Sequence, residues 1–385
     1  MVILVGMGEH MAEQYLPKYL LALGAGFISV GFLSAMDNFL GAIYSYFGGV
    51  VADRYGAKKS LLVFNLITMF GFLLVIAFPN WIVVILAAAM FISWSAISLP
   101  ATMELVSKVL PKNKRTMGVS IHSLTRRIPM ALGPVVGAFF IFYYGDVAGI
   151  RIAFIVSACF VVVATILQQV LIVDDRKDVV VKEKKHAKAL FREMSPQLRN
   201  LLVSDILIRF CQQIPDAFVV IWVLGSETTP GFVNVLQFGA LKTIEMVTAM
   251  VVYIPVAYFA DKLGKKPFVI VTFVFFTLFP LVLLFSKNFV LLVFAFILRG
   301  LKEFGEPSRK AMIMDLAPED KKAAMFGLYY LLRDTIVSVA AFGGGLLWMI
   351  SPQVNLITAF AIGIIGTVYF IIFGKDVSVA QPAKA

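Results

Sequence analysis

The chain of 385 residues is 60% hydrophobic and only 15% charged, and its formal net charge is +11. Soluble domains carry about 25% charged and about 45–50% apolar residues, so this composition excludes an ordinary soluble protein. The basic excess does not indicate nucleic-acid binding, because Lys and Arg gather in short segments between apolar runs, which is the positive-inside pattern of membrane proteins.

Twelve apolar runs are long enough to be transmembrane helices, since about 20 apolar residues cross the hydrocarbon core. The predicted spans are 1–23, 27–50, 60–78, 82–106, 116–143, 150–172, 199–224, 232–259, 267–286, 289–315, 322–348 and 354–373. The charged loops lie at 53–59, 108–115, 174–198, 261–266 and 318–322. They alternate with loops that hold few Lys or Arg, which predicts a multi-pass protein of the cytoplasmic membrane with both termini in the cytoplasm.

The long polar segment 174–198 divides six spans from six. We therefore expect an all-α membrane protein of twelve transmembrane helices in two pseudo-symmetric six-helix bundles. The bundles cover 1–173 and 199–374, the segment 174–198 is a cytoplasmic linker, and 375–385 is a cytoplasmic tail. The linker fits a solvated segment with a short surface helix, and a regulatory or lipid-contacting role for its lysines stays open.

The two halves repeat each other. VVADRYGAKKS follows the second span and YFADKLGKKPF follows the eighth. Arg126 matches Arg333 and Gly137 matches Gly344, each pair 207 residues apart. A repeat on this scale predicts two bundles with similar membrane orientation.

These paired loops resemble the signature of the major facilitator superfamily of secondary transporters, G-x-x-x-D-[RK]-x-G-[RK]-[RK]. The first copy holds Gly49, Asp53, Arg54, Gly56, Lys58 and Lys59, and the second holds Asp261, Lys262, Gly264 and Lys266. Ala57 and Ala257 are departures from the signature. The resemblance implies a conformational latch between two bundles at these residues. The alternative is that the basic residues serve membrane topology alone.

The fifth span carries ALGPVVGA, which is similar to the glycine–proline motif of antiporters in this family through Gly133, Pro134 and Gly137. The resemblance implies a helix hinge and favours antiport, hence export. Pro129 and Ala138 stand where the motif has glycine. The alternative is simply a bent and closely packed helix, because Gly and Pro are common in membrane helices.

Ionisable residues avoid the interiors of the third, ninth and twelfth spans, and the sixth has only Arg151 at its end. The family resemblance places these four helices in an outer layer and the others around a central cavity. Charges should avoid lipid and face the bundle interior, so the charge distribution agrees with that arrangement.

Within the other spans the charges form stripes. The seventh span places Asp205, Arg209, Gln212, Gln213 and Asp216 on one helical face. The tenth span is expected to line up Arg299, Lys302, Glu303, Glu306, Arg309 and Lys310, and the first span lines up Glu9 and Glu13.

Arginine suits carboxylate or phosphate groups and stays charged, whereas buried carboxylates can titrate. The candidate substrate-binding residues are therefore Arg126, Arg209, Arg299, Arg333, Gln213, Glu303 and Glu306. The candidates for proton coupling are Glu9, Glu13 and Asp216. The alternative is that many of these charges pair with one another, and Arg127, Lys242, Glu245 and Asp334 suit structural ion pairs.

The sequence thus predicts a monomeric, proton-coupled secondary active transporter in the lipid bilayer that works by alternating access. Its substrate would be a small polar, anionic or zwitterionic solute, with export favoured. The alternatives are a multidrug or lipid/H+ antiporter and a non-transporting receptor or scaffold on the same fold. We expect no enzyme, cofactor, metal or nucleic-acid partner, because neither a nucleophile–base pair nor a metal-ligand spacing is present.

Overall fold

The computed structural model of the chain describes residues 2–92, 94, 98, 115–172, 187–226, 229–318 and 322–375. Inside the described helices and strands, the side chains of residues 2, 45–50, 52–54, 57, 115–124, 187–189, 229, 253–263 and 322–324 are outside that description. The described residues are helical apart from connecting turns and one short hairpin.

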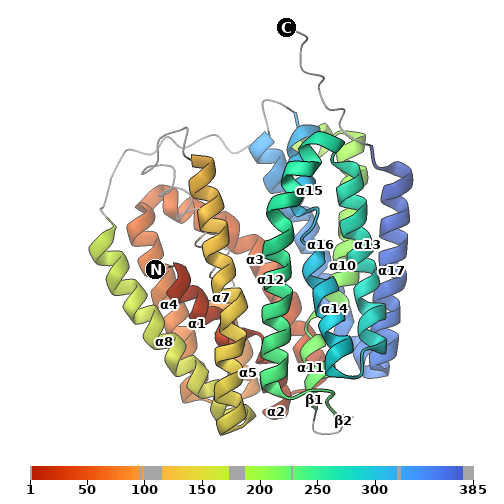
Figure 1. The fold of residues 1–385 in the computed structure, drawn as a ribbon. Helices are drawn as coiled ribbons and strands as arrows, with labels where there is room; N and C mark the ends of the chain where they lie inside the picture. Colours follow the sequence, from red (N-terminus) through yellow and green to blue (C-terminus); the bar gives the residue numbers. More distant parts are fainter. Residues whose placement is uncertain are drawn as a thin grey trace. The chain divides into compact units, whose positions relative to one another are not determined.

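The chain forms two compact units (Figure 1). The first contains residues 1–182 and 217–243. Its helices are α1 (Val2–Glu13), α2 (Leu16–Ala22), α3 (Phe27–Tyr55), α4 (Ala57–Ala77), α5 (Trp81–Phe91), α7 (Arg115–Tyr144), α8 (Asp146–Leu171) and α11 (Val219–Leu224). It also holds the antiparallel hairpin of β1 (Gly225–Ser226) and β2 (Thr229–Pro230).

The second unit contains residues 183–216 and 244–385. Its helices are α9 (Ala187–Glu193), α10 (Pro196–Asp216), α13 (Lys266–Phe285), α14 (Phe289–Leu301), α15 (Glu306–Leu316), α16 (Lys322–Ile350) and α17 (Pro352–Phe373). Helix α12 (Val235–Leu263) belongs to the first unit up to Thr243 and to the second from Ile244.

Nine helical segments in the described part of the chain are long and apolar enough to cross a membrane, and they coincide with nine of the twelve predicted spans. The predicted span 82–106 begins as α5 and continues into residues outside the description. The expectation of unbroken helices over 1–23 and 289–315 is wrong, because each consists of two shorter helices, and the span 199–224 is likewise divided into α10 and α11.

Glycine and proline explain the breaks in the first and tenth spans. Pro17 stands in the first turn of α2, where its missing N–H costs nothing but where it cannot continue α1. In the tenth span, residues 302–305 form turns before α15, and Pro307 again lies in the first helical turn. The Gly305 N–H donates to the hydroxyl of Thr272 on α13, which fixes the break against its neighbour. The six charges of the tenth span therefore do not share one continuous helical face.

The internal repeat is visible in how α7 and α16 pack. A Cβ atom on Gly137 would collide with the Met11 carbonyl of α1, and one on Gly344 would collide with the Ile214 carbonyl of α10. Each repeat-related glycine thus lets two helices approach backbone to backbone within its own unit. The two glycines therefore make equivalent contacts, as the sequence repeat predicts.

Two further pairs are 208 residues apart, one more than the spacing of the glycine pair. Gly56 and Gly264 both have positive φ, +77° and +91°, in the turns that precede α4 and α13. That conformation favours glycine, which accounts for the two motif glycines as turn residues. Asn80 and Asn288 cap α5 and α14 by accepting hydrogen bonds from Ile82 and Leu291, both at 2.9 Å.

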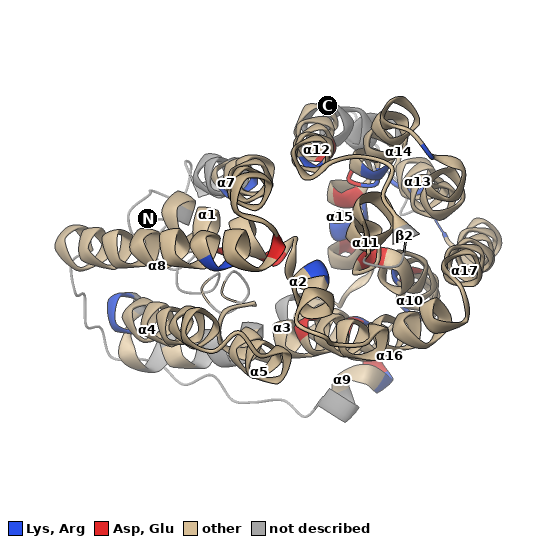
Figure 2. Ribbon diagram, turned by 90° about the horizontal axis from the view of Figure 1, so that it is seen from below, with Lys and Arg blue, Asp and Glu red and all other residues tan. Residues whose placement is uncertain are grey.

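Large apolar side chains stay exposed along α8 and α17, among them Val163, Ile166, Val170, Ile365 and Ile372. Figure 2 shows no charged residue on α17, whereas α12 and α15 carry both signs. An apolar surface of this kind suits contact with lipid, as the charge distribution of the sequence predicts for the sixth and twelfth spans.

The end of the predicted linker is packed rather than solvated. Leu190 and Met194, in and just after α9, are buried with Leu198 and Ile313 in the apolar core of the second unit. The hydroxyl of Ser195 donates to the Leu316 carbonyl at the end of α15. Residues 187–198 are therefore part of the second unit.

The glycine contact gives a matched test on two adjacent residues. Gly344→Ala should lower the melting temperature because its new Cβ meets the Ile214 carbonyl, whereas a Cβ on Gly343 meets nothing within 4 Å. Gly343→Ala should be neutral or raise the melting temperature, since alanine favours a helix by about 1 kcal/mol over glycine. Thermal unfolding of both variants in detergent checks this, and equal melting temperatures would contradict the packing.

Candidate functional site

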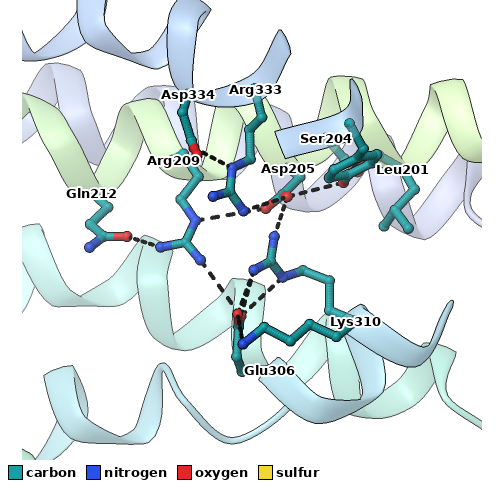
Figure 3. Close-up of polar contacts among 11 residues, drawn as sticks. Leu201, Ser204, Asp205, Arg209, Gln212, Glu306, Lys310, Arg333 and Asp334 are labelled. Atoms are coloured by element: carbon teal, nitrogen blue, oxygen red, sulfur yellow. Dashed lines mark hydrogen bonds and ion pairs between the residues drawn. The ribbon is translucent and has the colours of Figure 1, made fainter. Parts of the chain in front are cut away.

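Asp205 on α10 is the centre of a buried ionic network in the second unit (Figure 3). Its side chain is 1% exposed, and its Oδ2 forms an ion pair with Arg309 Nη1 of α15. The same oxygen accepts a hydrogen bond from the Tyr329 hydroxyl at 3.0 Å and lies 3.4 Å from Arg333 Nη1, both on α16. One carboxylate thereby ties three helices together.

Glu306 at the start of α15 is the second acid of this network. It receives three hydrogen bonds from Arg309, at 2.6, 2.8 and 3.1 Å. Lys310 Nζ lies 3.4 Å and Arg209 Nη2 lies 3.6 Å from its carboxylate oxygens. Arg309 is thus held by two carboxylates, as a fully buried guanidinium requires.

The remaining arginines are partnered to different degrees. Arg333 donates to Asp334 at 2.7 Å, and its guanidinium carbon lies 4.2 Å from the centre of the Tyr330 ring. Arg209 donates to Gln212 at 2.7 Å, but its Nε is 3.9 Å from Asp205 Oδ1, beyond hydrogen-bond distance. Arg209 therefore has ion pairs with weaker geometry than those of Arg309 and Arg333.

A second ionic cluster joins α10, α12 and α14. Arg299 Nη2 donates to Asp216 Oδ1 at 2.5 Å, and Arg299 Nε lies 3.5 Å from Glu245 Oε1. Lys302 Nζ is 3.6 Å from the same Glu245 oxygen. The guanidinium of Arg299 also packs 5.2 Å from the Phe279 ring centre. Asp216 and Arg299, predicted for different roles, are partners of one another.

The first unit has a smaller polar cluster on α1 and α7. Glu9 is 4% exposed, and His10 Nδ1 lies 2.8 Å from Glu13 Oε2. Arg126 on α7 is partly buried and close enough to Glu9 for a Coulombic interaction. Among the described residues, Arg126 has no ion pair within 4 Å and no hydrogen bond. This distinguishes it from its repeat partner Arg333.

The predicted hinge residues form the surface of α7 on which α1 packs. A Cβ atom on Gly133 would lie 2.9 Å from the Cβ of His10, and the contact at Gly137 is closer still. The Tyr15 hydroxyl donates to the Pro134 carbonyl at 2.6 Å. The geometry therefore accounts for these residues by close packing, and a hinge at this point stays a prediction.

The predicted latch is described only in part. The side chains of Asp53, Arg54, Asp261 and Lys262 and the contacts of Gly49 lie outside the part of the chain that the structure describes.

Three lysines of the predicted latch lie in the described part of the chain. The Lys58 carbonyl accepts a hydrogen bond from Gln168 at 3.0 Å, and Lys59 is exposed. Lys266 Nζ donates to the Ile371 carbonyl near the end of α17 at 3.1 Å, a favourable place for a cation.

Several residues of these clusters were missing from the predicted site. Asp205 and Arg309 belonged to predicted charge stripes without an assigned role, and Glu245 and Asp334 are confirmed as ion-pair residues. Tyr329 had no signal beyond its position four residues before Arg333, on the same helical face. Gln213 and Glu303 are partly buried. Across the residues that the structure describes, no three His, Cys, Asp or Glu side chains are grouped to hold a metal ion.

Removal of the Asp205 carboxylate tests the network. Asp205→Ala leaves two buried guanidiniums without their shared acid, which should cost about 3–5 kcal/mol and lower the yield of folded protein. The control is Asp146→Asn, which removes a partly exposed ion pair with Lys18 and should cost at most about 1 kcal/mol. Melting temperatures in detergent check the contrast, and similar losses in the two variants would refute the role of Asp205.

Comparison with known proteins identifies the family to which the chain belongs. The family model of the Major Facilitator Superfamily matches residues 1–226 and 201–384. The multi-drug resistance efflux pump PmrA of Streptococcus pneumoniae is 25% identical over 282 residues, which is 70% of this chain and 67% of that protein. The uncharacterized MFS-type transporter MJ1317 of Methanocaldococcus jannaschii is 22% identical over 370 residues, or 93% of this chain and 89% of that protein.

Solved structures agree on the fold. A mutant of the nucleoside transporter NupG superposes with a TM-score of 0.75 at 15% identity, covering 97% of this chain and 98% of its own. A bacterial homologue of the iron transporter ferroportin in the inward-facing state gives 0.75 at 14% identity, covering 97% of each chain. The chain therefore belongs to the major facilitator superfamily and is an all-α, multi-pass membrane transporter.

Proposed function

We propose that the protein is a proton-coupled secondary active transporter of a small anionic or zwitterionic solute, with export favoured, working by alternating access in the cytoplasmic membrane. The observation that carries this proposal is the state of Arg126. A partly buried guanidinium in a membrane helix, without an ion pair among the described residues, supports a role in binding an anionic group from outside the chain.

The two repeat-related arginines differ in their ion pairs. Arg333 is engaged by Asp205 and Asp334, so a solute would have to displace one of these acids to bind it. Among the described residues, Arg126 has only the longer-range Coulombic influences of Glu9 and of the neighbouring Arg127. Its planar fork can bind a carboxylate through two parallel hydrogen bonds. We therefore assign the anion contact to Arg126 first, and direct solute contact by Arg209, Arg299 and Arg333 stays a prediction.

Proton coupling is proposed at carboxylates that already have a partner to release. Asp216 pairs with Arg299, Glu13 contacts His10, and Glu9 is buried on the same helix as Glu13. Protonation of a paired carboxylate abolishes its attraction to the partner, which is the kind of event that can shift a two-state equilibrium. The proposal thus links proton binding to a contact between α10 and α14 in the second unit and to a contact within α1 in the first.

Export of amphiphilic drugs is the second candidate function, because the relative PmrA is a multi-drug resistance efflux pump. The charged clusters on α10, α12, α14 and α15 favour a polar solute over an apolar drug. A receptor or scaffold on the same fold would bind a ligand without moving it. Solute counterflow in proteoliposomes separates that alternative from a transporter.

The first test identifies solutes by their effect on thermal unfolding, since a specific ligand stabilises the folded protein by mass action. The panel contains amino acids, dipeptides, monocarboxylates, dicarboxylates and cationic dyes. A solute that stabilises the protein is then followed into proteoliposomes with and without an imposed proton gradient. We expect transport to rise at least severalfold with the gradient, and equal rates in both conditions would reject proton coupling.

The second test concerns the anion contact. Arg126→Lys should reduce transport about 10- to 100-fold, because a lost charge-assisted hydrogen bond is worth about 1.5–3 kcal/mol. Its melting temperature without solute should stay near that of the wild type, since no described ion pair is broken. Arg192→Lys, at an exposed position of α9, is the matched control. Full transport by the Arg126 variant would overturn the assignment.

A further inference from the structure

We propose that Trp94, Asn65 and Gln168 are positioning residues for the signature turn of the first unit, residues 56–59. They hold the backbone of this turn from outside the signature, and the predicted latch depends on them. The inference rests on the proposed transport by alternating access. It adds three uncharged side chains to the latch residues that the signature contains.

The three side chains form a chain of hydrogen bonds. Trp94 Nε1, just after α5, donates to Asn65 Oδ1 on α4 at 2.9 Å. Asn65 Nδ2 donates to Gln168 Oε1 on α8 at 2.8 Å. Gln168 Nε2 then donates to the Lys58 carbonyl in the signature turn at 3.0 Å. Since α4 packs against both α5 and α8 (Figure 1), the chain connects three helical segments of the first unit to the turn.

The direction of every hydrogen bond in this chain is determined by its two ends. An indole N–H can only donate, and a backbone carbonyl can only accept. Asn65 must therefore turn its oxygen toward Trp94 and its amide nitrogen toward Gln168. Gln168 in turn accepts from Asn65 and donates to Lys58. No other orientation of the two amides satisfies both ends, so the chain has a single hydrogen-bonded arrangement.

The chain is buried and carries no charge. Trp94, Asn65 and Gln168 are 3%, 0% and 1% exposed. A buried amide is costly unless its polar atoms are paired. Asn65 Nδ2 also donates to Thr165 Oγ1 at 3.1 Å, so both of its N–H groups are paired. None of these side chains titrates in the physiological range, so the contact with the turn does not respond to pH.

The signature turn is held at two backbone carbonyls besides that of Lys58. Gly56 begins the turn at a φ of +77°, and no side chain caps α4 there. The buried Ser60 hydroxyl lies 2.8 Å from the Gly56 carbonyl and 3.0 Å from the Val51 carbonyl of α3. Ser60 therefore holds the turn to α3, and Gln168 holds it to α8.

The corresponding turn of the second unit is held by different chemistry. Lys266 stands 208 residues after Lys58, and its Nζ donates to a carbonyl of α17 at 3.1 Å. Phe273 stands 208 residues after Asn65 and packs against Phe370 of α17, with ring centres 5.2 Å apart. A lysine ammonium group thus ties the second turn to its neighbouring helix, whereas a glutamine amide ties the first.

This difference leaves the ammonium group of Lys58 out of the contact. Gln168 meets the Lys58 backbone, and the Lys58 side chain has no ion pair among the described residues. Lys59 beside it is exposed. The first turn therefore has a backbone held in place and two cationic side chains that are not needed to hold it. A latch requires both, a defined position and charges that can bind a partner.

The contact with the turn is tested by hydrogen exchange in the full-length protein. Gln168→Met keeps the length of the side chain but removes its amide. We expect the backbone amides of residues 56–62 to exchange about 2- to 10-fold faster, which corresponds to the loss of one hydrogen bond.

Gln169→Met is the matched control on the same helix. Gln169 Nε2 is buried without a hydrogen-bond partner in the described part of the chain, so this variant should exchange like the wild type. Equal exchange in wild type and Gln168→Met, or equally faster exchange in the two variants, would overturn the proposal.

The role in the latch is tested by comparison with Asp53→Asn, which removes the carboxylate of the signature itself. Spin labels at Tyr143→Cys on α7 and Val290→Cys on α14, both exposed positions, report the distances between the two units in a Cys159→Ser background. Gln168→Met should shift the populations of these distances in the same direction as Asp53→Asn. The double variant should shift them no further than the larger single shift.

Three results would overturn the role in the latch: wild-type populations in Gln168→Met, additive shifts in the double variant, or no shift in Asp53→Asn. If Gln168→Met does not fold, Trp94→Phe serves in both measurements, because it keeps an aromatic ring and removes the donor that orients both amides. Neither measurement uses a solute or a proton gradient. Transport that ignores a gradient would reject the proposed coupling and leave these results standing, and unchanged exchange would reject the positioning residues while gradient-driven transport stands.

Discussion

The second unit depends on the neutralisation of one buried carboxylate. Asp205 is almost fully enclosed, and α15 and α16 reach it through Arg309, Tyr329 and Arg333. Ions enclosed within membrane-spanning helices are costly unless they are paired. The arrangement of α10, α15 and α16 is therefore the one that brings these opposite charges together, and the turn that separates α14 from α15 places Glu306 where it can hold Arg309.

The two units share a scaffold but differ in its charges. Gly137 and Gly344 make equivalent close contacts, and Gly56 and Gly264 make equivalent turns. The ion pairs of the two units are not equivalent, because Arg333 contacts carboxylates while Arg126 has none at ion-pair distance among the described residues. The repeat sets the backbone geometry in each unit, and the difference in ion pairing leaves Arg126 as the arginine suited to an external anion.

The fold could be predicted from the sequence because the sequence patterns that indicate it are local or periodic. Hydrophobic length identified the spans, and the doubled motif with its spacing identified the family. The breaks in the first and tenth spans were missed, because hydropathy is insensitive to a turn of a few residues. Pro17 and the Gly305–Pro307 segment were the available signals, but Gly and Pro also occur inside intact membrane helices.

The partners within the site could not be derived in the same way. Asp205 and Arg333 are 128 residues apart, and a charge stripe says only which face of a helix is polar. It does not say which opposite charge comes from the neighbouring helix. The four candidate arginines were therefore equivalent in the sequence, and only the structure separates Arg126 from the ion-paired Arg299 and Arg333.

The central claim is that the ion-paired arginines hold the helices together while Arg126 serves the solute. Thermal unfolding of Arg126→Gln, Arg299→Gln and Arg333→Gln, each with and without a stabilising solute, tests it most directly. We expect Arg126→Gln to keep the wild-type melting temperature and to lose its response to the solute. Arg299→Gln and Arg333→Gln should melt at clearly lower temperature and still respond. A destabilised Arg126→Gln that keeps the full solute response would contradict the account.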